Sequence, residues 1–200
     1  MINFSAQIIS IIFHPAVISV VTPFVLFFLI EHKISYSLFW FFYPLFFIAL
    51  VILFTLYGMR RKMFSDFDVT NRAERKPLYL FVIILSVIYL ILLFLFGGPK
   101  SFMALGLGVL IGAVIFEMIN RRLKASVHVA AVAAFMCTLA LLYGGFYLLL
   151  PLLIPLIAWS RIHMKRHTFS EAVTGGTVGI FLTVTIYLVI EYILHTYGGA

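Results

Sequence analysis

The sequence predicts an all-α polytopic membrane bundle with six or seven transmembrane helices, and three observations lead to this prediction. Hydrophobic residues make up 64% of the 200-residue chain and charged residues only 10%, whereas a soluble domain usually carries about 25% charged residues. Mean hydropathy is +1.17. The apolar residues also gather in runs near the roughly 20 residues that one helical span requires. A soluble globular fold is therefore excluded, and we expect residues 1–200 to form a single integral membrane domain.

Seven runs are apolar all round, as lipid-immersed helices are. They cover residues 8–30, 37–58, 78–97, 101–119, 129–145, 146–161 and 172–195. We interpret the first as a retained span, because Met1-Ile2-Asn3 lacks the basic stretch of a signal peptide. The run 146–161 is the weakest, since it is short and contains Pro151 and Pro155.

The boundary between the fifth and sixth runs decides the number of spans. Gly144-Gly145 separates the two runs, and a pair of glycines is typical of a helix break. If residues 129–161 instead formed one long tilted helix, the chain would have six spans and its topology would change.

Glycines spaced four residues apart predict where helices approach closely. One such pair, Gly108 and Gly112, lies in the fourth run, and another, Gly175 and Gly179, lies in the seventh. Small residues at this spacing let two backbones come together, so we expect them to serve helix packing. The single cysteine, Cys137, lies inside an apolar run, which excludes a disulfide framework and a cysteine metal site.

Basic residues predict the orientation of the bundle. With seven spans, segments 59–77, 120–128 and 160–171 fall on one membrane face, and they hold 12 of the 14 Lys and Arg residues. The opposite face has only Lys33 and Lys100. By the positive-inside rule we expect the loop-rich face to be cytoplasmic, in a prokaryotic cell membrane. The net charge of +7 suits lipid headgroups or an anionic substrate better than nucleic acid.

The segment from Ser160 to Glu171 carries the most informative polar pattern. His167 and Glu171 are four residues apart, so they share a face if the last helix begins nearby. The carboxylate can then accept the Nδ1 proton of the imidazole, which leaves Nε2 as a nucleophile or base. The structural alternative is a basic helix end that faces lipid phosphates.

A second cluster runs from Lys124 to His128. Ser126, the amides of a helix N-terminus and His128 converge there, and helix N-termini attract phosphate. Taken alone, Ser126 would be a helix cap and His128 an interfacial residue. Glu117 lies four residues before Arg121, and we favour an ion pair between them over a role for Glu117 in positioning His128.

The third cluster is the longest polar stretch, residues 66–77. It holds Arg72, Arg75 and Lys76, three cations within five residues just before a span. Arginine forks suit bidentate phosphate contacts, so Arg72 and Arg75, one helical turn apart, could clamp one phosphoryl group. A solvated positive-inside loop is the simpler interpretation of this stretch by itself.

Together these clusters resemble the three signatures of the type 2 phosphatidic acid phosphatase family, the lipid phosphate phosphatases. Those signatures are K-x6-R-P, then P-S-G-H, then S-R-x5-H-x3-D, here called the first, second and third motifs. Ser160-Arg161, His167 and Glu171 fit the third motif, with Glu in place of Asp. Gly175-Gly176 and Gly179 also look like its glycine-rich continuation.

The other two motifs depart further from the family pattern. Ser126 and His128 fit the second motif, but Ala125 replaces its proline and Val127 its glycine. In the first motif, Lys76-Pro77 or Arg75 can stand for R-P, yet Val69 occupies the lysine position and Arg72 is a substitute from one turn away. The resemblance covers about residues 60–185, here called the motif-bearing core.

The resemblance implies a phosphohydrolase that needs no metal or other cofactor and acts on a lipid phosphate or polyprenyl diphosphate. His167 would attack phosphorus and form a phosphohistidine, Glu171 would orient and activate it, and His128 would protonate the leaving oxygen. The remaining site residues would bind phosphate: Arg161, Ser126, Arg72, Arg75, Lys76 and Lys124. Positioning and charge stabilisation are what phosphoryl transfer mainly demands.

Two other functions stay open at this point. Residues 68–78 also look like the Asp-rich loop of intramembrane aromatic prenyltransferases, which hold magnesium on a prenyl diphosphate. Those enzymes carry a second Asp-rich loop, for which this sequence has no candidate, and around nine spans, which do not fit in 200 residues. A lipid-binding relative that kept the fold but lost turnover is the other alternative, motivated by Val127 and the missing lysine. The sequence does not predict an oligomeric state.

Overall fold

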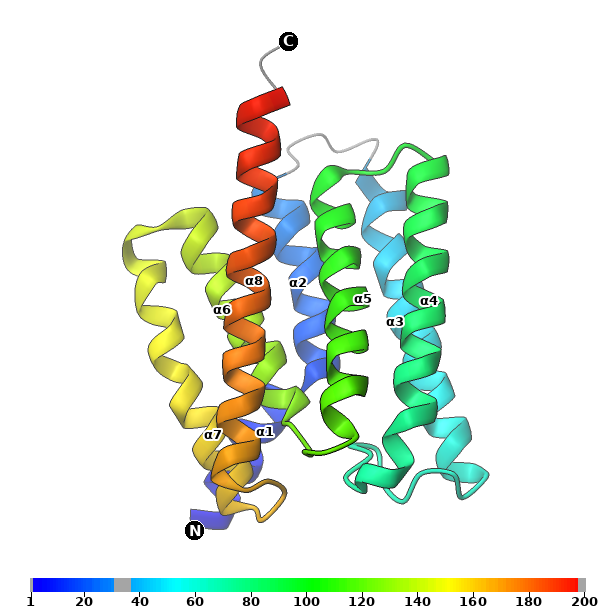
Figure 1. The fold of residues 1–200 in the computed structure, drawn as a ribbon, viewed down its shortest axis with the longest axis vertical. Helices are drawn as coiled ribbons and strands as arrows, with labels where there is room; N and C mark the ends of the chain where they lie inside the picture. The colour runs from blue at the N-terminus through cyan, green and yellow to red at the C-terminus, as the bar shows by residue number, and fades with distance from the viewer. Residues whose placement is uncertain (1, 31–36, 198–200) are drawn as a thin grey trace. The chain divides into compact units, whose positions relative to one another are not determined.

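The computed structural model describes residues 2–30 and 37–197, and every regular element in them is helical (Figure 1). The elements are α1 (Ile2–Ile12), α2 (Pro15–Ile30), α3 (Ser37–Arg60), η1 (Arg72–Glu74), α4 (Arg75–Leu95), α5 (Lys100–Asn120), α6 (Val127–Tyr143), η2 (Gly145–Leu153), α7 (Ile154–His163) and α8 (Phe169–Tyr197), where η denotes a 3₁₀ helix. The predicted all-α polytopic bundle is confirmed. Lys33 lies outside the described residues.

Five helical segments are long and apolar enough to cross a membrane. They are Phe39–Arg60, Arg72–Leu95, Lys100–Asn120, Gly145–His163 and Phe169–Tyr192. A sixth results if α1 and α2 together count as one span. The remaining apolar helix, α6, has 17 residues and is shorter than these. We expected the weakest span at 146–161, but η2 continues into α7 and gives that segment sufficient length.

The first apolar run is broken where one uninterrupted span was expected. α1 ends at Ile12, α2 begins at Pro15, and the two helices are bent by 41°. Proline has no N–H to donate and disfavours helical backbone at the residue before it, so the chain leaves the helix at His14 and restarts at Pro15. His14 thereby becomes a polar residue at a helix junction.

The glycine pair separates the fifth and sixth runs as the sequence predicts. Gly144 and Gly145 have φ angles of 58° and 51°, which glycine adopts without the steric cost that other residues meet. The chain turns there, and η2 and α7 pack back against α6 (Figure 1). A single tilted helix over 129–161 is therefore excluded.

By its internal contacts the chain divides into two compact units. Unit 1 comprises residues 1–18 and 125–200, and unit 2 comprises residues 19–124. In unit 1, α6 packs against α8, and α1 packs against α7. Its core consists of buried apolar residues of α2, α6, α7 and α8: Ile18, Val129, Val132, Ala133, Met136, Cys137, Ile154, Ile157 and Ala172.

Glycines of α8 allow its close approach to α6. A Cβ on Gly175 would collide with the backbone carbonyl of Ser126, and one on Gly179 would collide with that of Ala130. The packing role predicted for Gly175 and Gly179 is confirmed. Because no side chain fits between these backbones, the start of α8 is held directly against the start of α6.

Unit 2 is built on the α4–α5 pair, with α3 packed against α4. Its core is mainly aromatic and contains Trp40, Tyr43, Phe47, Tyr89, Leu93 and Phe102. The hydroxyl of Tyr43 donates to the carbonyl of Tyr89 over 2.6 Å, which ties α3 to α4. On α5, a Cβ on the buried Gly106 would collide with the Tyr89 ring.

Candidate functional site

The loop between α7 and α8 presents His167. α7 ends at His163, and Lys165 follows with a positive φ of 57°. The amide of Arg166 donates to the carbonyl of Arg161 over 3.1 Å, and the amide of Lys165 donates to that of Ile162 over 2.9 Å. These two bonds form a Schellman motif, which reverses the chain sharply after a helix.

His167 and Glu171 form the pair that their spacing predicts. Nδ1 of His167 lies 3.1 Å from Oε2 of Glu171, and the side chains are 1% and 16% exposed. Because the carboxylate accepts a proton from Nδ1, it fixes the tautomer in which Nε2 holds a lone pair. The arrangement can therefore supply a nucleophilic nitrogen at Nε2.

Glu171 also completes the N-terminus of α8. Its Oε2 accepts the amide proton of Thr168 over 3.0 Å, while its own amide donates to the hydroxyl of Thr168 over 3.3 Å. This reciprocal pair is a capping box, which satisfies amides that the helix itself leaves without acceptors. The carboxylate is thus anchored to the backbone before it meets His167.

The second and third motifs are joined by a backbone hydrogen bond. The amide of Ser126 donates to the carbonyl of Glu171 over 3.0 Å. Ser126 is fully buried and is the N-cap of α6, with its hydroxyl accepting from the amide of Val129 over 3.5 Å. The expected capping role of Ser126 is confirmed, and the cap stands directly beside the start of α8.

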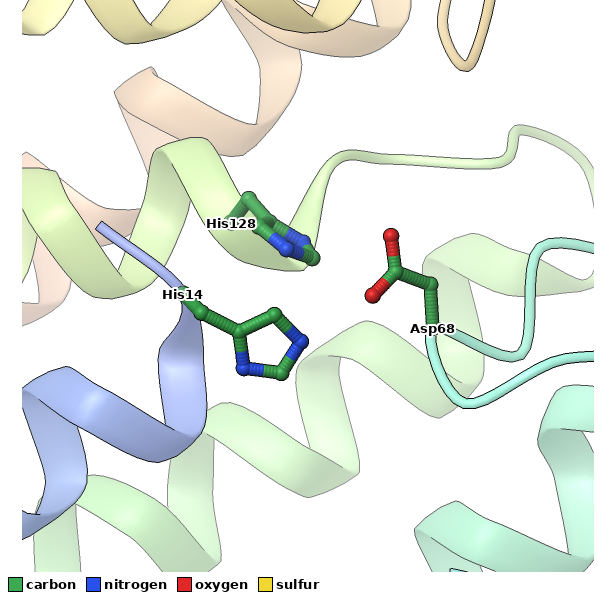
Figure 2. Close-up of side chains that lie close together, drawn as sticks. All are labelled: His14, Asp68 and His128. Atoms are coloured by element: carbon green, nitrogen blue, oxygen red, sulfur yellow. The ribbon is translucent and has the colours of Figure 1, made fainter. Parts of the chain in front are cut away.

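His128 lies in the first turn of α6 and contacts a histidine that the sequence reasoning missed. Figure 2 shows His14, from the junction of α1 and α2, with the edge of its ring against the face of the His128 ring. The two centroids are 4.8 Å apart and the ring planes are at 90°. His128 is buried and His14 half-buried. Asp68, also drawn in Figure 2, belongs to unit 2.

Arg161 is the largest fully buried side chain of unit 1 and links α7 to α1. Its Nη1 donates to the hydroxyl of Ser10 over 2.7 Å, and the neighbouring Ser160 donates to the carbonyl of Ala6 over 2.7 Å. An arginine has five N–H donors, so the bond to Ser10 leaves the phosphate-binding role of Arg161 as a prediction. The structure adds an anchoring role for the N-terminal helix.

The other predicted phosphate ligands belong to unit 2. Exposed Arg72 donates to the carbonyl of Arg122 over 2.8 Å, whereas buried Arg75 donates from Nε to the carbonyl of Val69 over 2.9 Å. The two guanidinium groups thus bind different carbonyls, and their proposed joint clamp stays a prediction. Lys76 is exposed and Lys124 half-exposed.

Polar contacts hold the loops of unit 2 together at one end. Asn120 at the end of α5 donates to the carbonyl of Arg72 over 3.1 Å. The pair between Glu117 and Arg121, favoured from sequence, is confirmed with Oε2 and Nη2 3.0 Å apart. Segments 59–77 and 120–124 therefore meet at the same end of unit 2, as expected for loops on one membrane face (Figure 1).

Three residues of unit 1 were missed in the sequence, namely His14, Thr168 and Ser10, and the first two left a local pattern. His14-Pro15 interrupts an apolar run, and an ionisable residue inside such a run is a functional candidate by default. Thr168 and Glu171 fit the T-x-x-E capping-box pattern. Ser10 is an ordinary small polar residue of an apolar helix, so nothing in the sequence distinguishes it.

Unit 1 therefore assembles a buried imidazole with a carboxylate on Nδ1, a second histidine, a capped helix N-terminus and a buried arginine. Such a set can position and neutralise an anionic group while a nitrogen attacks it. Comparison with family models, with curated proteins and with solved structures finds no match for this chain.

Proposed function

We propose that this protein is a membrane-embedded phosphohydrolase that removes phosphate from a lipid phosphate or diphosphate through a phosphohistidine intermediate. The observation that carries the proposal is the buried His167, held at Nδ1 by Glu171, whose backbone carbonyl in turn binds Ser126 of the second motif. Nucleophile, orienting carboxylate and phosphate-binding helix terminus are thereby linked within one unit. The resemblance to the lipid phosphate phosphatases supports the same assignment.

The reaction proceeds in two steps. Nε2 of His167 attacks phosphorus, the bond from phosphorus to the lipid oxygen breaks, and His128 gives its proton to that oxygen. Water then attacks the phosphohistidine, His128 takes a proton from this water, and inorganic phosphate leaves with His167 restored. The proton on Nδ1 of His167 stays on the ring throughout. The carboxylate of Glu171 accepts a hydrogen bond from it and stabilises the positive charge that the ring acquires.

Charge stabilisation comes from the cations and the helix terminus. Arg161, Ser126 and the N-terminal amides of α6 bind the oxygens on phosphorus in unit 1. Arg72, Arg75, Lys76 and Lys124 belong to unit 2, and their phosphate-binding role stays a prediction from the resemblance. No metal is required in this scheme, because protein cations fulfil the electrostatic role.

The membrane setting of the chain supports a lipid substrate. The helices carry many exposed large apolar side chains, among them Phe94, Phe146 and Leu152, which suit contact with acyl or prenyl chains. Twelve of 14 basic residues lie in the three loop segments, and this bias supports action at the cytoplasmic face of a prokaryotic cell membrane.

The test is phosphate release by purified protein in mixed micelles. Phosphatidic acid, a polyprenyl phosphate and a polyprenyl diphosphate are each assayed with and without EDTA, beside the His167→Ala variant. We expect release that withstands EDTA and vanishes in the variant. Magnesium-dependent prenyl transfer would favour the prenyltransferase alternative, and substrate binding without turnover would favour the lipid-binding relative; either result overturns the proposal.

A further inference from the structure

His14 is a polar group placed inside the first apolar run. It stands at the junction of α1 and α2, where the helices are bent by 41°. Ionisable residues in an apolar membrane segment cost free energy and are therefore rare. His14 also lies outside the motif-bearing core, so the resemblance assigns it no role.

The ring of His14 is held by the backbone at the start of α2. Its Nδ1 accepts the amide proton of Ala16 over 3.1 Å, and its carbonyl accepts that of Ile18 over 3.0 Å. These bonds make His14 the N-cap of α2, with Pro15 at the first helical position. Because Nδ1 is an acceptor, the neutral ring carries its proton on Nε2.

This fixed ring packs on the face of His128. The centroids are 4.8 Å apart, the planes are perpendicular, and the edge of His14 meets the face of His128 (Figure 2). Edge-to-face contact of this kind is favourable, since the ring edge is positive and the face negative. The nitrogens of His128 lie in its ring plane, so a contact on the face restricts rotation without using either nitrogen.

The backbone of His128 is fixed independently of His14. It follows Ser126, which caps α6 and donates its amide to the carbonyl of Glu171. That bond sets where the Cα of His128 lies relative to His167, but the side-chain dihedrals of His128 need a further constraint. The ring of His14 supplies a contact that limits them.

We propose that His14 is a positioning residue that holds the His128 ring in the orientation from which it protonates the leaving oxygen. This inference rests on the proposed function and deepens it. Misplacing a proton donor by a small distance lowers the rate in proportion to how much the reaction needs that proton. A good leaving group departs without it, whereas a poor one depends on it.

The experiment compares leaving groups in the His14→Asn variant. Asparagine is a good N-cap and can accept the Ala16 amide, so it keeps the start of α2 while removing the ring. Nitrophenyl phosphate serves as the good leaving group, and phenyl phosphate and an alkyl lipid phosphate as the poor ones. We expect kcat to fall about tenfold to a hundredfold for the poor leaving groups and to change little for nitrophenyl phosphate.

Three matched variants separate positioning from fold stability. His14→Phe retains a ring against His128 and should keep a leaving-group dependence close to that of the wild type. His163→Asn removes a histidine stacked on Trp159 in the same unit. It should not lower kcat for the poor leaving groups more than for the good one. In a His128→Asn background, His14→Asn should have no further effect, because the donor that it positions is already absent.

The outcomes distinguish this inference from the proposed function. If wild-type protein releases no phosphate from any substrate, both fail together. If the wild type is active but His14→Asn lowers kcat equally for all substrates, or for none of them, only the positioning role is overturned. Should His14→Asn fail to fold, His14→Phe decides, since a changed leaving-group dependence with the ring still present contradicts the proposal.

Discussion

One carboxylate oxygen of Glu171 both holds His167 and closes the first turn of α8. Oε2 lies 3.1 Å from Nδ1 of His167 and 3.0 Å from the amide nitrogen of Thr168. The same atom therefore serves helix capping, which stabilises the fold, and imidazole orientation, which would serve catalysis. Substitutions of Glu171 and of its capping partner Thr168 can separate the capping role from the orienting role.

We expect Glu171→Gln to lower phosphate release by about 10²–10⁴-fold while changing stability little. The amide oxygen can still accept from Thr168, but it carries no charge to stabilise the imidazolium of His167. Phosphate-release kinetics and thermal unfolding in detergent measure the two effects.

The complementary variant is Thr168→Val, which removes the hydroxyl that accepts the Glu171 amide. Loss of a helix cap costs about 1 kcal/mol, so the unfolding temperature should fall while activity is largely kept. An equal loss of activity in both variants would show that capping alone explains Glu171.

His167→Ala should abolish phosphate release and leave the protein folded. The substitution removes the nucleophile, and with it the covalent route. His163→Ala is the matched control, because it removes a histidine at the end of α7 that stacks on Trp159. A phosphoenzyme that is labile in acid and stable in base should be trapped in the wild type only, and activity within tenfold of wild type in His167→Ala would refute the mechanism.

Val127→Gly should release phosphate at least as fast as the wild type. Val127 is the first residue of α6 and has no positive φ, so valine causes no backbone strain there. At this position the site differs from the resembled motif only by the branched side chain of valine in place of glycine. A new amide contact to phosphate would raise the rate by at most roughly 10²–10³-fold, against about 1 kcal/mol of lost helix stability. A large loss of activity in folded protein would mean that valine belongs to this site's own design.

Cysteines at Ser65 and Lys165 should be shielded from a membrane-impermeant thiol reagent in intact cells, because we expect the loop-rich face to be cytoplasmic. Both residues are exposed, while the native Cys137 is buried and gives little background. Lys100→Cys is the positive control, since exposed Lys100 begins α5 at the opposite end of α4 from Ser65. Ready labelling of both loop positions would show that the loop-rich face lies outside the cell and that the expected orientation is wrong.

The sequence by itself determined the helical membrane fold and the local parts of the site. Apolar runs specify helices because only helices satisfy the backbone in lipid without outside partners. The break at Gly144-Gly145 is predictable for a similar reason, since backbone conformation there depends on the residues themselves. The pair of His167 and Glu171 was predictable because the two residues are only four positions apart, and the first turn of α8, which begins at Phe169, brings Glu171 back beside the bend that carries His167.

The tertiary structure alone decided which segments meet. Ser126 binds the carbonyl of Glu171, Arg161 binds Ser10 across 151 positions of sequence, and His14 packs on His128. These contacts join different helices that are apolar on every side, so no polar face in the sequence indicates which side turns inward. Which residues meet across the helices follows from helix packing. That packing is set by side-chain shape, by glycines such as Gly175 and by a few buried hydrogen bonds.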